Sequence, residues 1–124
     1  MKHQYSAIYD NVYIRPLDKS DIEKLREWRN NNEKTKYLRK IPYITSEMQA
    51  KWFQSYLENP DELTFAIVET KELKRVVGSV SLYNFNGETA EVGKIQIGDD
   101  EANGRGIGRK SLVMAMWIAF QELG

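Results

Sequence analysis

The sequence predicts an α+β fold in which helices lie on the faces of an antiparallel sheet of about four strands. Helix-forming patterns dominate the first half of the 124 residues, and runs of β-branched and aromatic residues separated by turn signals dominate the second half. A glycine-rich turn then opens one more helix. Helices followed by hairpin-connected strands are typical of α+β domains, and the length fits a single domain over residues 1–124.

The first half is expected to contain one strand and two main helices. Asn11–Pro16 alternates apolar and polar residues and reads as a first strand, entered from a loose N-terminus. Ser20–Glu23 has the spacing of a capping box, so a helix is expected to begin there and to stop at the asparagines of 30–32. A short helical turn is expected at 36–38. A second helix, capped by Thr45 or Ser46, is expected to end before Asn59.

The second half is expected to form an antiparallel meander. Leu63–Val68 and Val76–Phe85 are rich in β-formers and flank the charged turn 71–74. Asn86-Gly87 is a strong hairpin signal that leads into the last strand, over residues 90–97. The last strand of the meander is therefore expected to lead directly into the glycine-rich turn.

The last predicted strand changes its alternation partway along. Ala90 and Val92 share one face, whereas Ile95 and Ile97 fall on the other, so the phase slips near Gly93-Lys94. A slip of one residue is what a β-bulge produces. The alternative is a strand buried on both faces, where apolar residues need not alternate.

Composition and charge exclude several classes of function. Eighteen basic residues balance eighteen acidic ones, so there is no basic excess for a nucleic-acid surface. There is no cysteine and one histidine, His3, which leaves nothing for disulfides, thiol nucleophiles, Ser-His triads or histidine metal clusters. The apolar run 112–120 is too short to cross a bilayer, and its all-round apolar character predicts burial on nearly every side. The start lacks the pattern of a secretion signal, and a cytoplasmic location is expected.

The glycine-rich turn has the features of an anion-binding loop. Glycines at 104, 106 and 108 allow positive φ and let a ligand approach the backbone. The N-terminus of the following helix adds unpaired N–H groups and partial positive charge, which favour phosphate. Arg105, Arg109 and Lys110 are expected to reinforce this. The acidic residues 99–101 oppose it and are expected to turn to solvent.

Three phosphate-binding patterns and one structural alternative compete for this turn. A Walker loop requires lysine directly after its last glycine, but Arg109 intervenes before Lys110-Ser111. A dinucleotide fingerprint requires its third glycine one place later, and an acidic partner about twenty residues on, beyond the printed sequence. The third pattern is arginine or glutamine, two residues, then glycine-x-glycine. A tight turn that binds no ligand is the alternative.

The third pattern fits best, because Asn103 to Gly108 resembles the phosphate loop of the GNAT superfamily of N-acetyltransferases. Both required glycines match, as does the setting between a strand and a helix. Asn103 stands where the family has arginine or glutamine, which removes a side-chain contribution but leaves the backbone. Trp28-Arg29-Asn30 and the segment 47–53 resemble the branch that acetylates aminosugars of surface polysaccharides and flagellin glycans, beside the ribosomal-protein alanine acetyltransferases.

The resemblance implies an N-acetyltransferase that passes acetyl from acetyl-CoA to a primary amine of an aminosugar or a protein N-terminus. Glu91 is the expected carboxylate base, with Glu88 as a second candidate, and a backbone N–H near residues 94–96 is expected to polarise the thioester carbonyl. Arg29 is expected either to hold an anionic group of the acceptor or to end its helix. No metal, nucleic acid or membrane is expected as a partner. The residues expected to bind acetyl-CoA are Ile95, Gln96, Ile97, Asn103, Gly104, Arg105, Gly106, Ile107, Gly108 and Arg109.

The order of elements resembles the N-terminal two-thirds of a GNAT domain. The family continues with further strands and a helix that supplies a general acid, so the chain is expected to be a fragment. Its fourth strand and last helix are then expected to expose surface that favours self-association. Two alternatives stay open, namely a module that binds CoA or a partner protein without turnover and a small nucleotide-binding domain.

Overall fold

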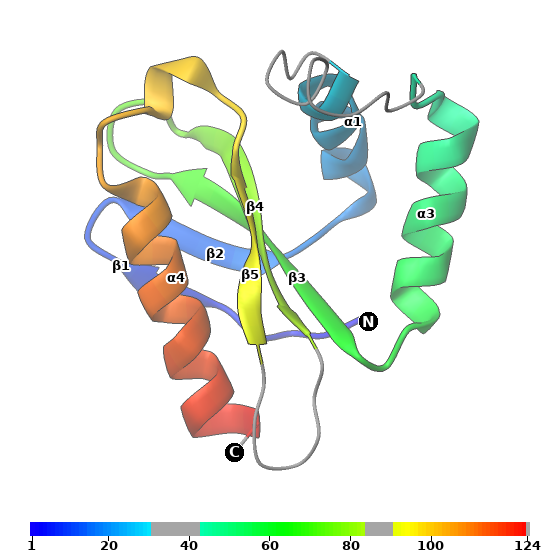
Figure 1. Ribbon diagram of the computed structural model, residues 1–124. Coiled ribbons are helices and arrows are strands. Elements are labelled where there is room, and N and C mark those ends of the chain that lie inside the picture. The colour runs from blue at the N-terminus through cyan, green and yellow to red at the C-terminus, as the bar shows by residue number, and fades with distance from the viewer. Residues whose placement is uncertain (31–42, 84–90, 124) are drawn as a thin grey trace.

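The computed structural model in Figure 1 describes residues 1–30, 43–83 and 91–123. These residues form a five-stranded antiparallel sheet in which each strand lies next to its neighbours in sequence, in the order β1-β2-β3-β4-β5. The α+β prediction is confirmed. The strands are β1 (Ala7–Tyr9), β2 (Val12–Pro16), β3 (Glu62–Glu69), β4 (Arg75–Tyr83) and β5 (Glu91–Ile97), and the α-helices are α1 (Ile22–Asn30), α3 (Ser46–Glu58) and α4 (Ile107–Ile118).

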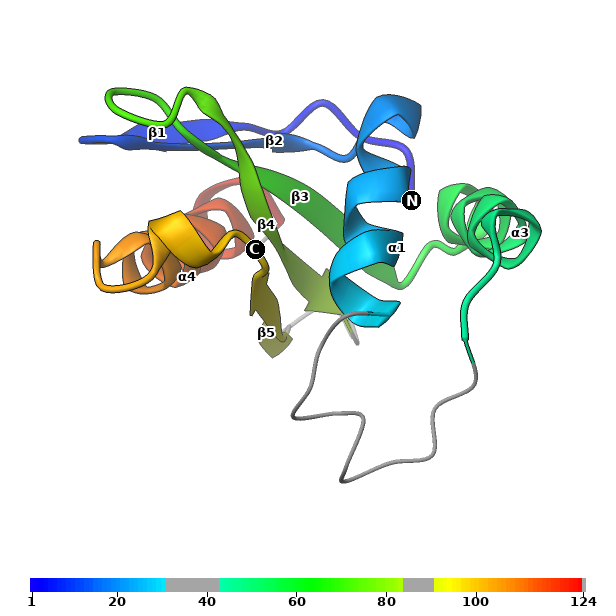
Figure 2. The ribbon, with the colours of Figure 1, turned by 90° about the horizontal axis from the view of Figure 1, so that it is seen from above.

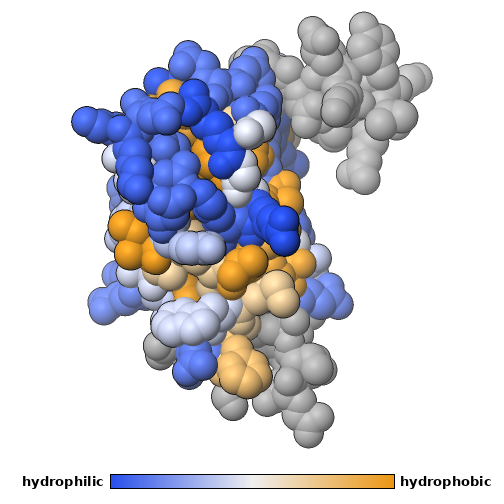
Figure 3. Space-filling model, turned by 90° about the vertical axis from the view of Figure 1, so that its left-hand side faces the viewer, coloured by the Kyte–Doolittle hydropathy of each residue, from blue (hydrophilic) through white to orange (hydrophobic). Residues whose placement is uncertain are grey.

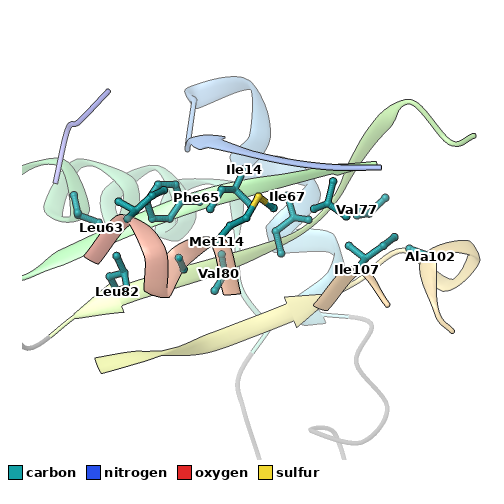
Figure 4. Close-up of a cluster of buried hydrophobic side chains, with 13 residues drawn as sticks. Ile14, Leu63, Phe65, Ile67, Val77, Val80, Leu82, Ala102, Ile107 and Met114 are labelled. Atoms are coloured by element: carbon teal, nitrogen blue, oxygen red, sulfur yellow. The ribbon is translucent and has the colours of Figure 1, made fainter. Parts of the chain in front are cut away.

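Helices cover both faces of the sheet, with α4 on one side and α1 and α3 on the other (Figure 2). Buried aliphatic residues of β2, β3 and β4 pack against Ile107, Met114, Ala115 and Ile118 of the α4 side, and part of this cluster is drawn in Figure 4. A smaller cluster on the opposite face joins α1 and α3 to the sheet around Tyr56. The two cores fix the sheet between its helical layers.

The N-terminus is ordered, so the prediction of a loose terminus was wrong, and this segment adds a strand to the predicted sheet of about four strands. Ala7–Tyr9 pairs with β2, which adds a fifth strand. The ring of His3 donates from Nε2 to the carbonyl of Thr64 (3.1 Å) and meets Phe65 edge-on, 4.8 Å between ring centroids. A strand of three residues is too short to show alternation in the sequence. Pairing with β2 stabilises its extended conformation.

The predicted capping box before α1 lies two residues earlier than expected. Asp18 caps a 3-10 turn over Lys19–Asp21, and Asp21 accepts in return from the Asp18 N–H. Asp21 is buried and forms a two-point ion pair with Arg15, at 2.8 and 2.9 Å. Asp18 and Asp21 have the same spacing as Ser20 and Glu23, and they form the capping box instead. Arg15 stabilises this arrangement because it pairs with the Asp21 carboxylate.

The second helix follows the prediction. Thr45 caps α3 by accepting from the N–H of Met48 (3.1 Å), and the helix ends at Glu58, before Asn59. The helical turn predicted at 36–38 lies outside the described residues. Across the described part, α1 and α3 pack side by side over one face of the sheet.

The bulge predicted in the last strand is confirmed. Ser79 pairs with Gln96 and Ser81 pairs with Gly93, so two steps along β4 match three steps along β5. Lys94 lies within this irregularity and has φ of 48°. As a result Val92 and Ile97, an odd number of residues apart, both pack against the α4-side core. The alternative of a strand buried on both faces is wrong.

The prediction that the run 112–120 is buried on every side was also wrong. Met114, Ala115 and Ile118 are buried, but Val113, Met116, Trp117 and Phe120 are 50 to 80% exposed. Their spacing of three and four residues makes one outer stripe on the helix and the π-helical turn that follows it. Apolar side chains on this side of the molecule are visible in the lower half of Figure 3. In the described ranges, no helix has the length and apolar character needed to cross a membrane.

Candidate functional site

The loop before α4 adopts the backbone conformation that its glycines permit. Gly104 and Gly106 have φ of 79° and 72°, in the left-handed region. A Cβ added at either position would meet no protein atom within 4 Å, so the loop presents an open face. Gly106 is the N-cap of α4, and no side chain caps the helix. The backbone of the loop is therefore accessible to a ligand.

The N–H groups of this loop have no acceptor in the described ranges. The first backbone hydrogen bond of α4 runs from the N–H of Lys110 to the carbonyl of Gly106 (3.2 Å). For the N–H groups from Gly104 to Arg109, neither a backbone carbonyl nor a side chain of the described residues accepts a hydrogen bond. Consecutive unpaired donors at the positive end of a helix dipole form an anion cradle.

Two of the three cations near the loop are engaged elsewhere. Arg105 donates from Nε to the carbonyl of Glu101 (2.7 Å) and pairs with Glu72. Lys110 donates to Asp10 (2.9 Å), in the turn between β1 and β2. Arg109 is exposed and forms no ion pair with a described residue. Of the three cations predicted to reinforce phosphate binding, Arg109 is thus the one whose charge is not neutralised by an ion pair with a described residue.

The acidic residues before the loop do not all turn to solvent as predicted. Asp99 keeps only 11% of its side chain exposed and pairs with Arg75 (2.7 Å). It also accepts from the N–H of Glu101 and so caps the 3-10 turn Asp100–Ala102. The hydrogen bond from Arg75 lowers the pKa of this carboxyl despite partial burial. The ion pair offsets negative charge that would oppose an anion in the loop.

Strand β5 lies beside the loop and divides its side chains between two faces. A Cβ on Gly108 would lie 3.5 Å from Ile95 and 3.8 Å from Ile97, so both isoleucines face the start of α4. Gln96 faces the opposite side and lines a pocket. Among the described strands β5 pairs with β4 alone, which leaves its outer edge open. The bulge at Lys94 interrupts the pairing midway along the strand.

The pocket lies between the sheet and the helices α1 and α3. Its volume is about 440 Å³. The lining combines hydroxyl, carboxamide and charged side chains with two apolar walls, and Arg29 of the predicted motif is among them. The lining residues are Leu25, Arg29, Gln49, Trp52, Glu62, Thr64, Ser79, Ser81, Lys94 and Gln96.

The predicted base Glu91 lies at the edge of this region. Glu62 on β3 and Glu91 on β5 both pair with Tyr83 on β4, so the three residues form one row across the same face of the sheet. Glu62 lines the pocket and pairs with Lys94 (3.0 Å), whereas Glu91 is exposed and outside the lining. Glu88 lies outside the described residues.

Trp28 of the predicted motif has a packing role. A Cβ on Gly98, directly after β5, would fall 2.0 Å from the indole ring, so the ring lies against this backbone. The N–H groups of Gly98 and Asp99 both donate to the carbonyl of Val77. This contact fixes the end of β5, and hence the start of the loop, relative to α1.

Reasoning from the sequence missed several residues of the pocket. Glu62, Gln49 and Lys94 lie far apart in the chain, and no short motif connects them. The register of three strands and the docking of α3 bring them together. Among the described residues, no group of three or more His, Asp or Glu side chains is placed to hold a metal ion.

The chain is similar to known acetyltransferases in sequence. A family model described as an acetyltransferase (GNAT) domain matches residues 11–124. Alpha/beta-tubulin-N-acetyltransferase 9 of Drosophila melanogaster is 24% identical over 119 residues, an alignment that covers 87% of this chain. The chain spans 59% of the length of that relative.

Solved structures show the same fold. A domain from Methanocaldococcus jannaschii superposes with a TM-score of 0.71 at 27% identity, covering 95% of this chain and 73% of the other. Spermidine N-acetyltransferase from Vibrio cholerae, in complex with CoA and spermine, superposes with a TM-score of 0.75 at 23% identity, covering 91% and 66%. Since the family model extends over nearly the whole sequence, the chain belongs to the GNAT acetyltransferase family.

Proposed function

We propose that the chain carries the cosubstrate and acceptor sites of an N-acetyltransferase that passes acetyl from acetyl-CoA to a primary amine. The observation that supports this most is the run of unpaired N–H groups from Gly104 to Arg109, next to a bulged edge strand. A pocket with polar walls lies on the other face of the same strand. Under this proposal a diphosphate, an extended arm and an amine would each occupy a separate place around β5.

The cosubstrate side of the proposal assigns binding to the loop and the strand. Gly104, Gly106 and Gly108 leave the backbone accessible, and the N–H groups of residues 104–109 would hold the pyrophosphate. Arg109 would add a charge to the same anion. The open edge of Ile95–Ile97 would donate and accept hydrogen bonds along the pantetheine arm. Acetyl-CoA supplies the activated acetyl group, and a backbone N–H near the bulge would polarise its carbonyl.

The acceptor side requires a base, because an alkylammonium with a pKa of about 10 has no lone pair with which to attack. The carboxylate row around Tyr83 offers two candidates. Glu91 is the candidate predicted from the sequence. Glu62 is the carboxylate that lines the pocket, where Lys94 orients it. Either carboxylate would accept the proton directly or through water.

Replacing each glutamate by glutamine tests which of the two carboxylates is the base. Glu62→Gln and Glu91→Gln each remove one negative charge at almost unchanged volume, on the same row of the sheet. The substitution at the base is expected to lower kcat by about a hundredfold or more, and the other to leave kcat within a few fold. The measurement is thiol release from acetyl-CoA with an amine panel, across pH. Equal, small effects of both substitutions would exclude this row as the source of the base.

The acceptor amine is the finer part of the proposal. The motifs at 28–30 and 47–53 favour an aminosugar or a protein N-terminus, whereas the named relatives act on tubulin and spermidine. The same panel should therefore contain an aminosugar, an alanine-terminated peptide and spermidine. Preference for the aminosugar or the peptide would support the branch of the family that the sequence motifs resemble.

A binding module without turnover is the second candidate function. The observation that favours it is that Glu91 is exposed outside the pocket lining, whereas Glu62 is already paired with Lys94. Calorimetric titration with CoA, followed by a thiol-release assay, separates the two candidates. Binding with thiol release supports the enzyme, and binding alone supports the module. Competition between ATP and CoA would instead favour the nucleotide-binding alternative.

Self-association stays a prediction. The open edge of β5 and the apolar stripe of Val113, Met116, Trp117 and Phe120 are the surfaces that would take part. Sedimentation tests this directly. A concentration-independent monomer without added ligand would contradict it.

A further inference from the structure

The pocket already contains a primary amine that belongs to the chain itself. Among the described residues that line the pocket, Lys94 alone carries such a group, since the other cation, Arg29, is a guanidinium that stays protonated. Nζ of Lys94 lies 3.0 Å from Oε1 of Glu62 and 4.9 Å from the centre of the Tyr83 ring. The ammonium group is thus held between a carboxylate and an aromatic face.

The β-bulge sets the direction of this side chain. Lys94 has φ of 48°, a conformation that lysine adopts less readily than glycine or asparagine, and it lies where the pairing of β5 with β4 shifts. Lys94 and Gln96 both line the pocket, whereas Ile95 between them faces the start of α4. The neighbouring Gly93 lets Tyr83 come close, because a Cβ there would lie 2.7 Å from the Tyr83 hydroxyl oxygen. The bulge therefore directs an amine into the pocket from the strand that is proposed to receive the thioester.

The contact between Lys94 and Glu62 combines an acetyl acceptor with a base. An ammonium group must lose a proton before it can attack, and the Glu62 carboxylate accepts a hydrogen bond from Nζ at 3.0 Å. The four-carbon stem of lysine is flexible, so Nζ can leave Glu62 and reach a carbonyl held by the backbone near the same residue. Donor and acceptor of the acetyl group would then meet within one chain.

We infer that Lys94 is an internal acetyl acceptor, so that the chain modifies itself when acetyl-CoA is bound and no other amine fills the pocket. The inference rests on the proposed function, because it takes the thioester to lie at the bulge of β5. Nζ passes a proton to Glu62, and its lone pair then forms a bond to the acetyl carbon while the bond from that carbon to sulfur breaks. Nitrogen loses two protons in all, of which one ends on the CoA thiol and the other in water.

The test incubates the full chain with acetyl-CoA in the absence of any added amine and follows the acetylation of each lysine by mass spectrometry. Lys94 is expected to gain one acetyl group at least about a hundredfold faster than Lys51, an exposed lysine of α3 that reports uncatalysed acetylation. The rate constant should saturate with acetyl-CoA. It should not depend on the concentration of the chain, because both reactants lie in one molecule.

Substitution of the carboxylate tests its part in the step. Glu62→Gln keeps the volume but removes the base, and it should slow the acetylation of Lys94 by about a hundredfold. Glu58→Gln is the matched control, because Glu58 is exposed at the end of α3, and it should leave the rate unchanged. If Glu62→Gln does not fold, the ratio of the Lys94 rate to the Lys51 rate and its dependence on chain concentration still decide the matter in the unsubstituted chain.

Calorimetric titration with CoA separates this inference from the proposed function. If CoA binds but Lys94 is acetylated no faster than Lys51, or at a rate constant that rises with chain concentration, the inference is overturned and the cosubstrate site stands. Absence of CoA binding would overturn both. Selective acetylation of Lys94 within one molecule would support both.

Discussion

Replacing Gly106 by leucine tests whether the open face of the loop serves ligand binding or only the stability of the fold. Gly106 has φ of 72°, a conformation that costs a residue with a side chain about 1–2 kcal/mol. No protein atom lies within 4 Å of the Cβ position, so a clash adds nothing to this cost. We therefore expect the free energy of unfolding to fall by about 1–2 kcal/mol and the fold to persist.

The affinity for CoA should fall much further. The leucine side chain would project over the open face and would displace the diphosphate from at least two N–H groups. Two charge-assisted hydrogen bonds at about 1.5 kcal/mol each correspond to roughly a hundredfold loss of affinity. Calorimetry with CoA and urea unfolding of the same samples measure the two quantities. Met116→Ala, on the exposed face of α4, is the control and should keep full affinity. Unchanged CoA affinity in Gly106→Leu would refute the assignment of the loop.

Two further predictions concern stability and charge. Burial alone would raise the pKa of Glu69, but hydrogen bonds from the backbone of the following turn and from Asn11 lower it from 4.5 to about 2. The ionised group therefore stabilises the fold fully above pH 4.5, and this contribution is lost as the pH falls toward 2. In Glu69→Gln, urea unfolding should show a loss of about 1–3 kcal/mol at pH 7 and a shallower dependence on pH below 4.5, whereas an unchanged acid limb would contradict the assignment. Arg109→Ala should weaken CoA binding by about tenfold, as measured by calorimetry. Lys110→Ala should change the affinity less than twofold, because Lys110 donates to Asp10. A larger effect of Lys110→Ala than of Arg109→Ala would contradict the assignment of Arg109 to the anion.

Local patterns in the sequence predicted the parts of the molecule that local physics controls. The phase slip between Val92 and Ile97 predicted the bulge, because alternation is a property of neighbouring residues within one strand. Glycines before an apolar run predicted the left-handed loop that opens α4. Thr45 and Ser46 together predicted the start of α3, where Thr45 is the N-cap, because an N-cap acts within one turn of its helix.

The features missed from the sequence depend on contacts between distant segments. Ala7–Tyr9 becomes a strand because β2 pairs with it, and Asp21 completes the capping box of Asp18 while Arg15 pairs with its carboxylate. Lys110 was expected at the phosphate site, but Asp10, a hundred positions earlier, holds it elsewhere. Glu62 reaches the pocket only through the register of the central strands. The sequence contains these partners without indicating that they meet.

We propose that the backbone N–H groups from Gly104 to Arg109 bind the diphosphate of CoA and that the bulged strand β5 binds the pantetheine arm. Amide chemical shifts of the labelled chain during titration with CoA test this most directly. We predict saturable shifts that are largest for residues 104–109, with smaller ones for 95–97. Saturable binding that shifts other amides and leaves these unmoved, or no binding at millimolar CoA, would contradict the claim.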